Sequence, residues 1–327
     1  MYKRGVVVGK FYPFHKGHQY LVETGLKGCD HLTVFVCDNP AYRIPAEIRA
    51  NWIRAIYPEA HVRVIADLEG HNDNSQIWAA YTIEQLGYVP DVVFTSEDYG
   101  IPYARYMGSE HVLVDYKRLH VPCSGTMIRS DPWAHPEFLH PLVRAYFVKR
   151  IALVGAESTG TTTTARLLAA HFHSCWVPEY GRFYWEGKQY SRLEQWDTDE
   201  FIHIALMQAA AEEHLARHAY RGLFCDTDPM ATGIWHRHYL HNRSRAVEDI
   251  AAKQRYDLYL ITDTDIPLEQ DGTRDADYEA RSLMHRRFIK AVKATGIPYA
   301  VLSGSLDGRM SQAIRLCEQV LAYNPVA

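Results

Sequence analysis

The stretch Gly9-Lys10-Phe11-Tyr12-Pro13-Phe14-His15-Lys16-Gly17-His18 decides how the first half of this chain folds. It directly follows a short apolar run, which is the pattern of a first strand that leads through a loop into a helix. Gly9 lets the backbone approach a nucleotide, and Gly17 opens a helix whose free N–H groups favour a polyphosphate. His15 and His18 are three residues apart, so both imidazoles can face the same anion. Two surface histidines in a turn would be the alternative, but the register of the whole stretch favours a phosphate-binding loop.

A second motif, Ser124-Gly125-Thr126-Met127-Ile128-Arg129, also stands where a loop enters a helix. Ser124 and Thr126 can cap that helix and donate hydroxyls, and Arg129 offers a fork of donors to phosphate oxygens. On its own this motif is typical of an ordinary capped helix. Together with the first motif, it indicates a nucleotide site.

The two motifs resemble the GxFxPxHxGH and SxTxxR signatures of the nucleotidylyltransferase superfamily, and the chain from residue 4 into its second half resembles the NadR-like bifunctional family. Proteins of that family join a nicotinamide mononucleotide adenylyltransferase to a ribosylnicotinamide kinase. The resemblance implies that the first half transfers the adenylyl group of ATP to nicotinamide mononucleotide, giving NAD and pyrophosphate. Members can carry an N-terminal helix-turn-helix that binds DNA. Because this sequence starts at the transferase strand, no repressor role is expected.

Such a reaction needs alignment and charge neutralisation rather than a covalent nucleophile. The acceptor phosphate is ionised near pH 7, since the second pKa of a phosphomonoester is about 6. It can therefore attack the α-phosphorus of ATP without a general base. His15, His18 and Arg129 are expected to be catalytic, helped by Mg²⁺ and by a nearby lysine. The residues expected to bind ATP are Gly9, Lys10, Phe11, Gly17, Ser124, Thr126 and Glu97.

The acceptor is indicated by residues 72–78, Asn-Asp-Asn-Ser-Gln-Ile-Trp, which resemble the family's nicotinamide-binding stretch, with Asn74 and Trp78 as substrate residues. Trp78 can stack on the pyridinium ring, a cation–π contact of about 1–2 kcal/mol when desolvated. From spacing alone, packing in the core is an equal alternative for Trp78. Glu97 follows an expected strand, where open α/β sheets bind ligands, so it can contact the adenosine ribose or cap the next helix.

The strand, loop and helix pattern restarts at Arg150, and residues 155–162 have the glycine spacing of a Walker A loop. Thr161 stands where a Walker A loop carries its lysine, which contacts the β- and γ-phosphates as negative charge develops on the leaving group. Threonine is neutral and too short for that role. The backbone N–H groups and the Mg²⁺-binding hydroxyl of Thr162 remain. The motif therefore predicts nucleotide binding more firmly than phosphoryl transfer. Its expected ligands are Gly155, Ser158, Gly160, Thr161 and Thr162.

Further residues of the second half are typical of a kinase. Glu179 can accept the proton of a riboside 5′-hydroxyl, with Tyr180 beside the substrate; a salt bridge from Glu179 to Arg182 is the alternative. Asp226 ends an expected strand, where a Walker B carboxylate holds Mg²⁺ together with Thr162. Asp228 can bind the substrate or cap a helix.

Residues 271–274, Asp-Gly-Thr-Arg, resemble a lid that brings Arg274 over the phosphates, with Arg281 beyond. An ordinary charged loop has the same composition. Arg274 or Arg182 can supply the charge that the missing lysine would provide. These elements favour an active nicotinamide riboside kinase over a degenerate domain that only senses nucleotide or riboside.

Length and composition limit the number of domains, the class of partner and the cellular compartment. The chain has 327 residues, and its runs predict two doubly wound parallel-sheet α/β domains, a Rossmann-like nucleotidylyltransferase domain at 1–147 and a P-loop kinase-like domain at 148–327. The net charge of −4 gives no basic field for nucleic acid, and the sequence has no apolar stretch for a membrane. The six cysteines are scattered, as in a cytoplasmic protein with reduced thiols.

Two matters stay open at this point. The first half can act on another phosphate acceptor, such as a flavin or pantetheine phosphate, because those transferases share the two-histidine signature. The sequence also leaves open whether the chain forms a homo-oligomer.

Overall fold

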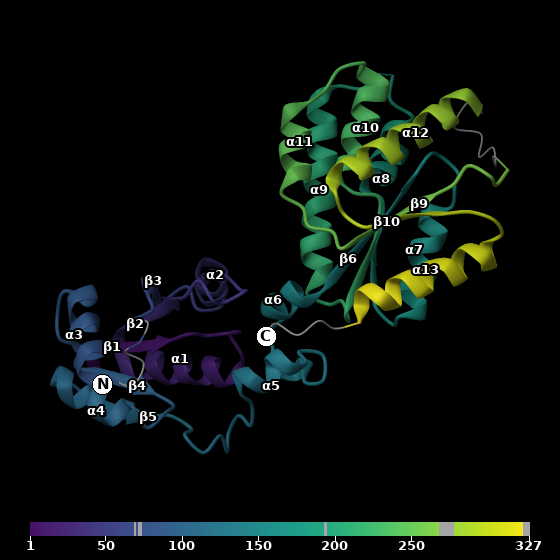
Figure 1. Cartoon of the computed structure of the whole chain (residues 1–327). Coiled ribbons are helices and arrows are strands. Elements are labelled where there is room, and N and C mark those ends of the chain that lie inside the picture. Colours follow the sequence, from purple (N-terminus) through teal and green to yellow (C-terminus); the bar gives the residue numbers. More distant parts are fainter. Residues whose placement is uncertain (69, 71–73, 193–194, 268–277, 323–327) are drawn as a thin grey trace. The chain divides into compact units, whose positions relative to one another are not determined.

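The computed structural model describes residues 1–68, 70, 74–192, 195–267 and 278–322 (Figure 1). The chain divides into two compact units, and the boundary between them falls between Arg144 and Ala145. The domain boundary expected at residue 147 lies close to this point. No helix in the described ranges combines the length and the apolar character needed to span a membrane.

The first unit is built on a five-stranded parallel sheet of order β3-β2-β1-β4-β5. Its strands are β1 (Tyr2–Gly9), β2 (Cys29–Asp38), β3 (His61–Ala66), β4 (Val92–Thr95) and β5 (Glu110–Leu113). Its helices are α1 (Lys16–Gly28), α2 (Ala46–Ile56), α3 (Ser75–Leu86), α4 (Gly100–Met107), α5 (Gly125–Ser130) and α6 (Pro141–Arg144). The strand order reverses at β1, so β1 and β4 open a crevice at their carboxyl ends, where such sheets bind ligands.

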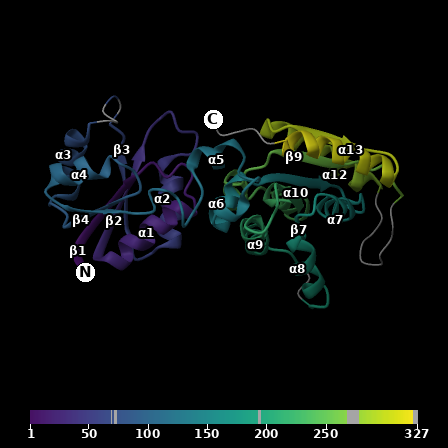
Figure 2. The same ribbon diagram turned by 90° about the horizontal axis from the view of Figure 1, so that it is seen from below.

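Alternate residues of β1 face opposite sides of this sheet. Val6 packs with Phe35 and with residues of α3 and α4 on one face. Gly5 lies on the other face, next to Cys29 at the end of α1. Helices therefore cover both faces, with α3 and α4 on one and α1 on the other (Figure 2).

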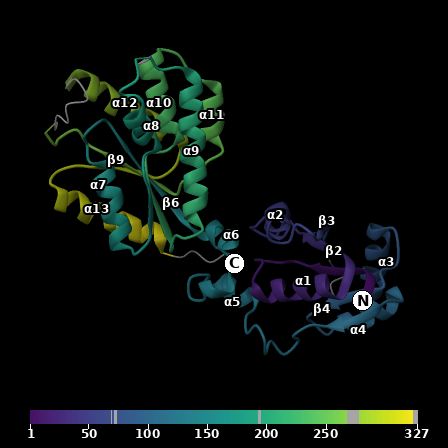
Figure 3. The ribbon, with the colours of Figure 1, turned by 180° about the vertical axis from the view of Figure 1, so that it is seen from behind.

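The second unit has a parallel sheet of order β10-β9-β6-β8-β7. Its strands are β6 (Lys149–Gly155), β7 (Cys175–Val177), β8 (Gly222–Asp226), β9 (Leu258–Thr262) and β10 (Tyr299–Leu302). Its helices are α7 (Thr161–His171), α8 (Tyr180–Lys188), α9 (Thr198–Ala216), α10 (Pro229–Leu240), α11 (Arg245–Ala252), α12 (Tyr278–Thr295) and α13 (Leu306–Leu321). Ile151 and Leu153 pack on α7 and α13, whereas Ala152 and Val154 pack on α10 and α12 (Figure 3).

Both units are thus parallel sheets with helices on both faces, which confirms the predicted doubly wound α/β class. Ile48, Trp52 and Ile56 recur every fourth residue between Pro45 and Pro58, which predicts a helix, and α2 lies within these bounds. Its buried face differs from the expected one, because Arg49 is fully buried. The guanidinium of Arg49 donates to the carbonyls of Ile44 and Cys37 at 3.0 and 3.1 Å.

Candidate functional site

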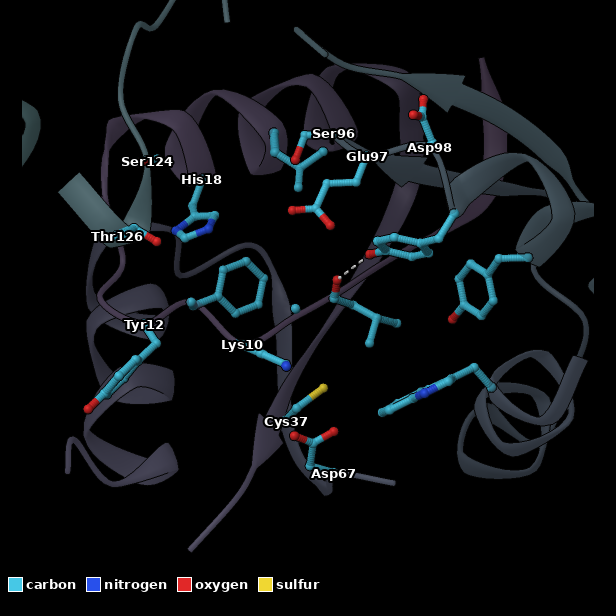
Figure 4. Close-up of a pocket in the computed structure, with 18 of the residues that line it drawn as sticks. Lys10, Tyr12, His18, Cys37, Asp67, Ser96, Glu97, Asp98, Ser124 and Thr126 are labelled. Carbon is cyan, nitrogen blue, oxygen red and sulfur yellow. Dashed lines mark hydrogen bonds between the residues drawn. The ribbon is translucent and has the colours of Figure 1, made fainter. Parts of the chain in front are cut away.

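A pocket of about 1160 Å³ opens at the carboxyl ends of β1 and β4 in the first unit (Figure 4). Both sequence motifs contribute to its walls. The predicted site residues that line it are Gly9, Lys10, Phe11, His18, Trp78, Glu97, Ser124, Thr126 and Arg129. The structure therefore brings together residues that lie more than a hundred positions apart in the sequence.

His15 and His18 form a reciprocal cap at the start of α1. The Nδ1 atom of each imidazole accepts the backbone N–H of the other residue at 3.4 Å, and the two rings stack with centroids 3.7 Å apart. His15 is buried beneath His18, and its Nδ1 lies 3.4 Å from the Cys123 thiol. Because Nδ1 accepts in both rings, each proton lies on Nε2.

Burial sets the protonation state of this pair. Burial, with further contributions from Arg118 and Arg129, lowers the pKa of His15 to about 4. Burial and the neighbouring His15 lower the pKa of His18 well below its ordinary value. Both imidazoles are therefore neutral at pH 7, and His18 can offer a neutral N–H donor to the pocket. The cationic role expected of the histidines thus passes to arginine and lysine side chains.

Arg129 joins the two motifs. Its Nη1 donates to the carbonyl of Tyr12 at 2.6 Å, and its Nη2 donates to Thr126 Oγ1 at 3.1 Å. Thr126 therefore holds Arg129, and the expectation that it caps the helix is wrong. Ser124 is the cap, because its Oγ accepts the N–H of the third residue of α5 at 3.1 Å. A Cβ on Gly125 would lie 2.9 Å from Arg129 Nη1 and 3.0 Å from the Tyr12 carbonyl oxygen, so a larger residue here would displace the guanidinium or the carbonyl that it binds.

Trp78 satisfies both interpretations of its role. It is half-buried, packs beside Tyr81 with ring centroids 6.0 Å apart, and lines the pocket. Asn74 is exposed and lies outside the pocket lining. Its Oδ1 accepts the N–H of Ile77 at 3.1 Å and caps α3. Residues 72 and 73 of the expected nicotinamide-binding stretch lie outside the described residues.

Three acidic residues in the described part of the chain line the pocket, Asp67, Glu97 and Asp98, and the sequence indicated a role for Glu97 alone. Glu97 follows β4 and its carboxylate points into the pocket (Figure 4). Asp67 follows β3 and was missed, although a carboxylate directly after a strand was an available signal. Its Oδ2 accepts from Asn39 at 3.1 Å, whereas its buried Oδ1 has no hydrogen-bond partner within the described ranges. Burial alone would lower the pKa of Lys10, but its hydrogen bond to Tyr42 and the charge of Asp67 outweigh this and raise it, so Lys10 stays cationic.

The second unit has a pocket of about 550 Å³ around the loop that joins β6 to α7. The predicted site residues that line it are Gly155, Ser158, Gly160, Thr161, Thr162 and Glu179. Ser158 and Gly160 both have positive φ values, 55° and 88°. Residues with positive φ thus alternate with a residue of ordinary φ, and such a backbone lets successive N–H groups point toward one anion.

Thr162 and Asp226 meet at the end of β8. Thr162 Oγ1 donates to Asp226 Oδ2 at 2.5 Å. Asp226 Oδ1 is buried and has no hydrogen-bond partner in the part of the chain that the structure describes. Burial raises the pKa of Asp226, although the hydrogen bond from Thr162 opposes the rise. An oxygen pair with one unused carboxylate oxygen fits Mg²⁺, which takes its other ligands from phosphates and water.

Asp228 does not belong to this site. Its side chain is fully buried, Oδ1 accepts the N–H of Ala231 at 2.8 Å, and Oδ2 accepts the hydroxyl of Tyr259 at 2.7 Å. Asp228 therefore caps α10, and the expected substrate role is wrong. Tyr180 lies outside the pocket lining, with its hydroxyl 3.1 Å from His203 Nε2.

The arginines differ from expectation as well. Arg274 lies outside the described residues. Arg281 was expected over the phosphates, but it is buried and donates to the backbone carbonyls of Glu157 and Ser158, both at 3.2 Å. It thus lies behind the loop rather than in a lid. Arg309 of α13 does the same at Thr159 and was not predicted.

Further side chains from other elements line the second pocket. Glu179 begins α8 and lines the pocket together with Arg182. The Nε of Arg182 lies 3.9 Å from Glu186. Trp235 of α10 adds an aromatic face that the sequence did not indicate. The pocket therefore combines an anion-binding loop, a carboxylate, a cation and an aromatic ring.

Comparison with protein families gives one match in each unit. Residues 4–72 match the model of the citrate lyase ligase C-terminal domain, and residues 150–309 match the model of an AAA domain. Among solved structures, a NadR protein in complex with NR superposes with a TM-score of 0.75 over 99% of this chain and 98% of that chain, at 21% identity. A NadR protein in complex with NAD and AMP-PNP gives a TM-score of 0.72 over 99% and 97%, also at 21% identity. These likenesses confirm the order and fold of the two units.

The curated relatives extend the similarity to sequence. The trifunctional NAD biosynthesis/regulator protein NadR of Salmonella typhimurium is 27% identical over 97% of this chain and 83% of that protein. The Escherichia coli protein of the same name matches at 27% over the same shares. Over almost its entire length, this chain is similar in sequence to the NadR proteins.

Proposed function

We propose that the first unit transfers the adenylyl group of ATP to nicotinamide mononucleotide, releasing pyrophosphate and forming NAD. One observation carries the proposal: His18 and Arg129, from two distant motifs, line one pocket, and Arg129 bonds to the Tyr12 carbonyl of the loop that leads to His18. The homology to proteins named for NAD biosynthesis supports the same assignment.

The acceptor phosphate supplies its own nucleophile. One of its oxygens forms a bond to the α-phosphorus of ATP, and the bond from that phosphorus to the bridging oxygen of pyrophosphate breaks. His18 donates its Nε2–H to the departing phosphates, and Arg129 and Lys10 compensate the charge that accumulates there. Mg²⁺, when bound, adds further charge compensation between the phosphates. No side chain has to accept a proton, which agrees with two histidines that are neutral Nε2–H donors.

The acceptor ring lies against Trp78 in this proposal. A pyridinium cation is attracted to the indole face, and the unpartnered Asp67 Oδ1 offers an acceptor for a ring substituent. Glu97 remains a proposed ligand of the adenosine ribose. A flavin or pantetheine phosphate carries no pyridinium and would gain less from Trp78.

For the second unit we propose phosphorylation of nicotinamide riboside, which would supply the acceptor of the first. The supporting observation is that Thr162, Asp226 and Glu179 lie at one end of the sheet, beside the loop. Glu179 accepts the proton of the 5′-hydroxyl, and Arg182 adds charge near the transferred group. Arg274 is kept as a proposed lid residue. The competing function is a riboside or nucleotide sensor, and the absence of a lysine at Thr161 is the observation that favours it.

Incubation with ATP, Mg²⁺ and one acceptor at a time tests both activities, with products identified by mass. We expect NAD and pyrophosphate from nicotinamide mononucleotide, and slower formation of nicotinamide mononucleotide from the riboside. A protein that is inactive on nicotinamide mononucleotide but adenylylates flavin mononucleotide or phosphopantetheine would overturn the acceptor assignment. A second unit that binds the riboside without phosphorylating it would be a sensor.

A further inference from the structure

The loop of the second unit is held from behind by two arginines that are distant in sequence. Arg281 Nε donates to the carbonyl of Glu157 at 3.2 Å, and its Nη2 donates to that of Ser158 at 3.2 Å. Arg309 Nη1 donates to the carbonyl of Thr159 at 2.8 Å. Three consecutive peptide groups therefore have their oxygens fixed by guanidinium groups.

Fixing the oxygens also fixes the opposite ends of these peptides. In a planar trans peptide the C=O and the following N–H point in opposite directions. The N–H groups of Ser158, Thr159 and Gly160 are therefore turned away from the arginines, and all three residues line the pocket. No hydrogen bond within the described ranges uses these three N–H groups.

The two arginines also bring charge to a loop, residues 155–162, that has no lysine or arginine of its own. Arg309 is paired with the carboxylate of Asp265. The remaining described bonds of Arg281 go to the carbonyls of Thr264 and Ile266, so in the described part of the chain its partners are all carbonyls. Arg281 is only 6% exposed, and burial lowers the pKa of its guanidinium although Asp263 and Asp265 attract the charge, so a bound anion nearby would stabilise it.

We propose that Arg281 and Arg309 are positioning residues that orient the N–H groups of residues 158–160 toward nucleotide phosphates and supply the positive charge that the loop lacks at Thr161. This inference rests on the proposed binding of a nucleoside triphosphate by the second unit. It goes further by assigning the charge of the site to residues outside the loop.

The orientation of the N–H groups and the added positive charge are linked by polarisation of the peptide groups. A guanidinium that donates to a carbonyl draws electron density toward that oxygen, which makes the N–H of the same peptide a stronger donor. Arg281 acts from behind the loop. Arg309 lines the pocket but is held by backbone carbonyls and Asp265, so the charge of both arginines favours bound phosphates before and during transfer alike. A lysine at position 161 would instead reach the phosphates directly and follow the transferred group. The arrangement therefore favours nucleotide binding and leaves transfer slow.

Hydrogen exchange of the peptide that covers residues 155–162 tests the inference, because it reports on this loop separately from the ATP site of the first unit. The full-length protein is titrated with Mg²⁺ and ATP, ADP or adenosine, and the midpoint of protection gives the affinity. Arg281→Met is expected to weaken ATP binding at least tenfold, weaken ADP binding less and leave adenosine unchanged. Arg286→Met, on an exposed residue of the same helix, is the matched control and should match wild type.

Rescue separates a charge effect from a packing effect. Thr161→Lys in the Arg281→Met background should restore most of the ATP affinity, because it returns a cation to the loop. Arg281→Lys should lie between wild type and Arg281→Met, and serves if Arg281→Met does not fold. An unchanged midpoint in folded Arg281→Met, equal losses for ATP and adenosine, or no rescue by Thr161→Lys would each overturn the inference. Wild-type protein that shows no protection with ATP would instead overturn nucleotide binding by the second unit.

Discussion

The two loops proposed to bind phosphates, residues 9–18 and 155–162, begin alike and offer different chemical groups. Each follows the strand at which its sheet reverses order, β1 or β6, and each leads into a helix. The first loop presents side chains, with His18 in the pocket and His15 beneath it. The second presents backbone N–H groups, and its nearest buried cations, Arg281 and Arg309, come from helices far along the chain. A substitution in the first loop therefore removes a chemical group, whereas charge in the second can be changed from outside the loop.

The largest effect is expected in the first loop. His18→Ala should lower the rate of NAD formation on the order of a hundredfold or more, because a positioned donor to developing charge is lost. The measurement is steady-state NAD formation from nicotinamide mononucleotide and ATP. His31→Ala, on an exposed histidine of the same unit, is the control. Equal rates for His18→Ala and wild type would remove the imidazole from the mechanism.

In the second loop, a gain of positive charge should raise the reaction rate, whereas the loss of His18 in the first loop lowers it. Thr161→Lys should raise phosphorylation of nicotinamide riboside by about tenfold or more, because the new cation can follow the transferred group. Ala170→Lys adds the same charge at an exposed position near the other end of α7, outside the pocket lining, and should change the rate little. If both variants bind ATP and neither they nor wild type form product, the second unit is a sensor.

A smaller effect is expected at the acceptor side of the first pocket. Trp78→Ala should raise the Kd for nicotinamide mononucleotide roughly 5- to 30-fold, as expected for the loss of a cation–π contact, with ATP affinity almost unchanged. Trp78→Phe keeps an aromatic face and should recover part of the affinity. Core packing predicts instead a fall in the free energy of unfolding of about 3–5 kcal/mol with no selective loss of acceptor. Calorimetric titration and thermal unfolding of the same samples distinguish the two roles.

The smallest expected effect is a difference between the two units in how their stability depends on pH. Burial lowers the pKa of His15 from its ordinary 6.5 to about 4, so the unfolded chain binds more protons in this window and the first unit loses stability as pH falls through it. Burial raises the pKa of Glu212 in the second unit from 4.5 to about 8, so that unit loses stability as pH rises through this range. Hydrogen exchange of core amides in each unit at pH 5 and pH 7.5 measures both trends.

Glu212→Gln is the matched test of this contrast. It should reduce the pH dependence of the second unit and leave that of the first unchanged. Parallel trends in the two units of the wild-type protein would contradict the assigned protonation states.

The fold was largely predictable because parallel strands are short apolar runs that the sequence displays directly. Helix α2 was predicted from its period of apolar residues, yet its buried face was not. Arg49 lies inside because its guanidinium can bind the carbonyls of Ile44 and Cys37, and no periodicity of apolar residues reports such bonds.

The sites were predictable where function resides in residues close together in sequence. His15 and His18 are of this kind. Asp228 was assigned wrongly because a carboxylate after a strand can serve a substrate or a helix, and only its burial decides for the helix. Arg281 and Arg309 could not be assigned from sequence, because their partners are backbone carbonyls more than a hundred residues away.

One measurement tests the central claim, that two loops of different chemistry carry out successive reactions. Wild-type protein, His18→Ala and Asp226→Asn are each given nicotinamide riboside, ATP and Mg²⁺, and the products are identified by mass. We predict NAD from wild type, accumulated nicotinamide mononucleotide from His18→Ala, and neither product from Asp226→Asn, which should still form NAD when given nicotinamide mononucleotide. NAD formation from the riboside by Asp226→Asn at the wild-type rate, or the failure of wild type to form NAD from nicotinamide mononucleotide, would contradict the account.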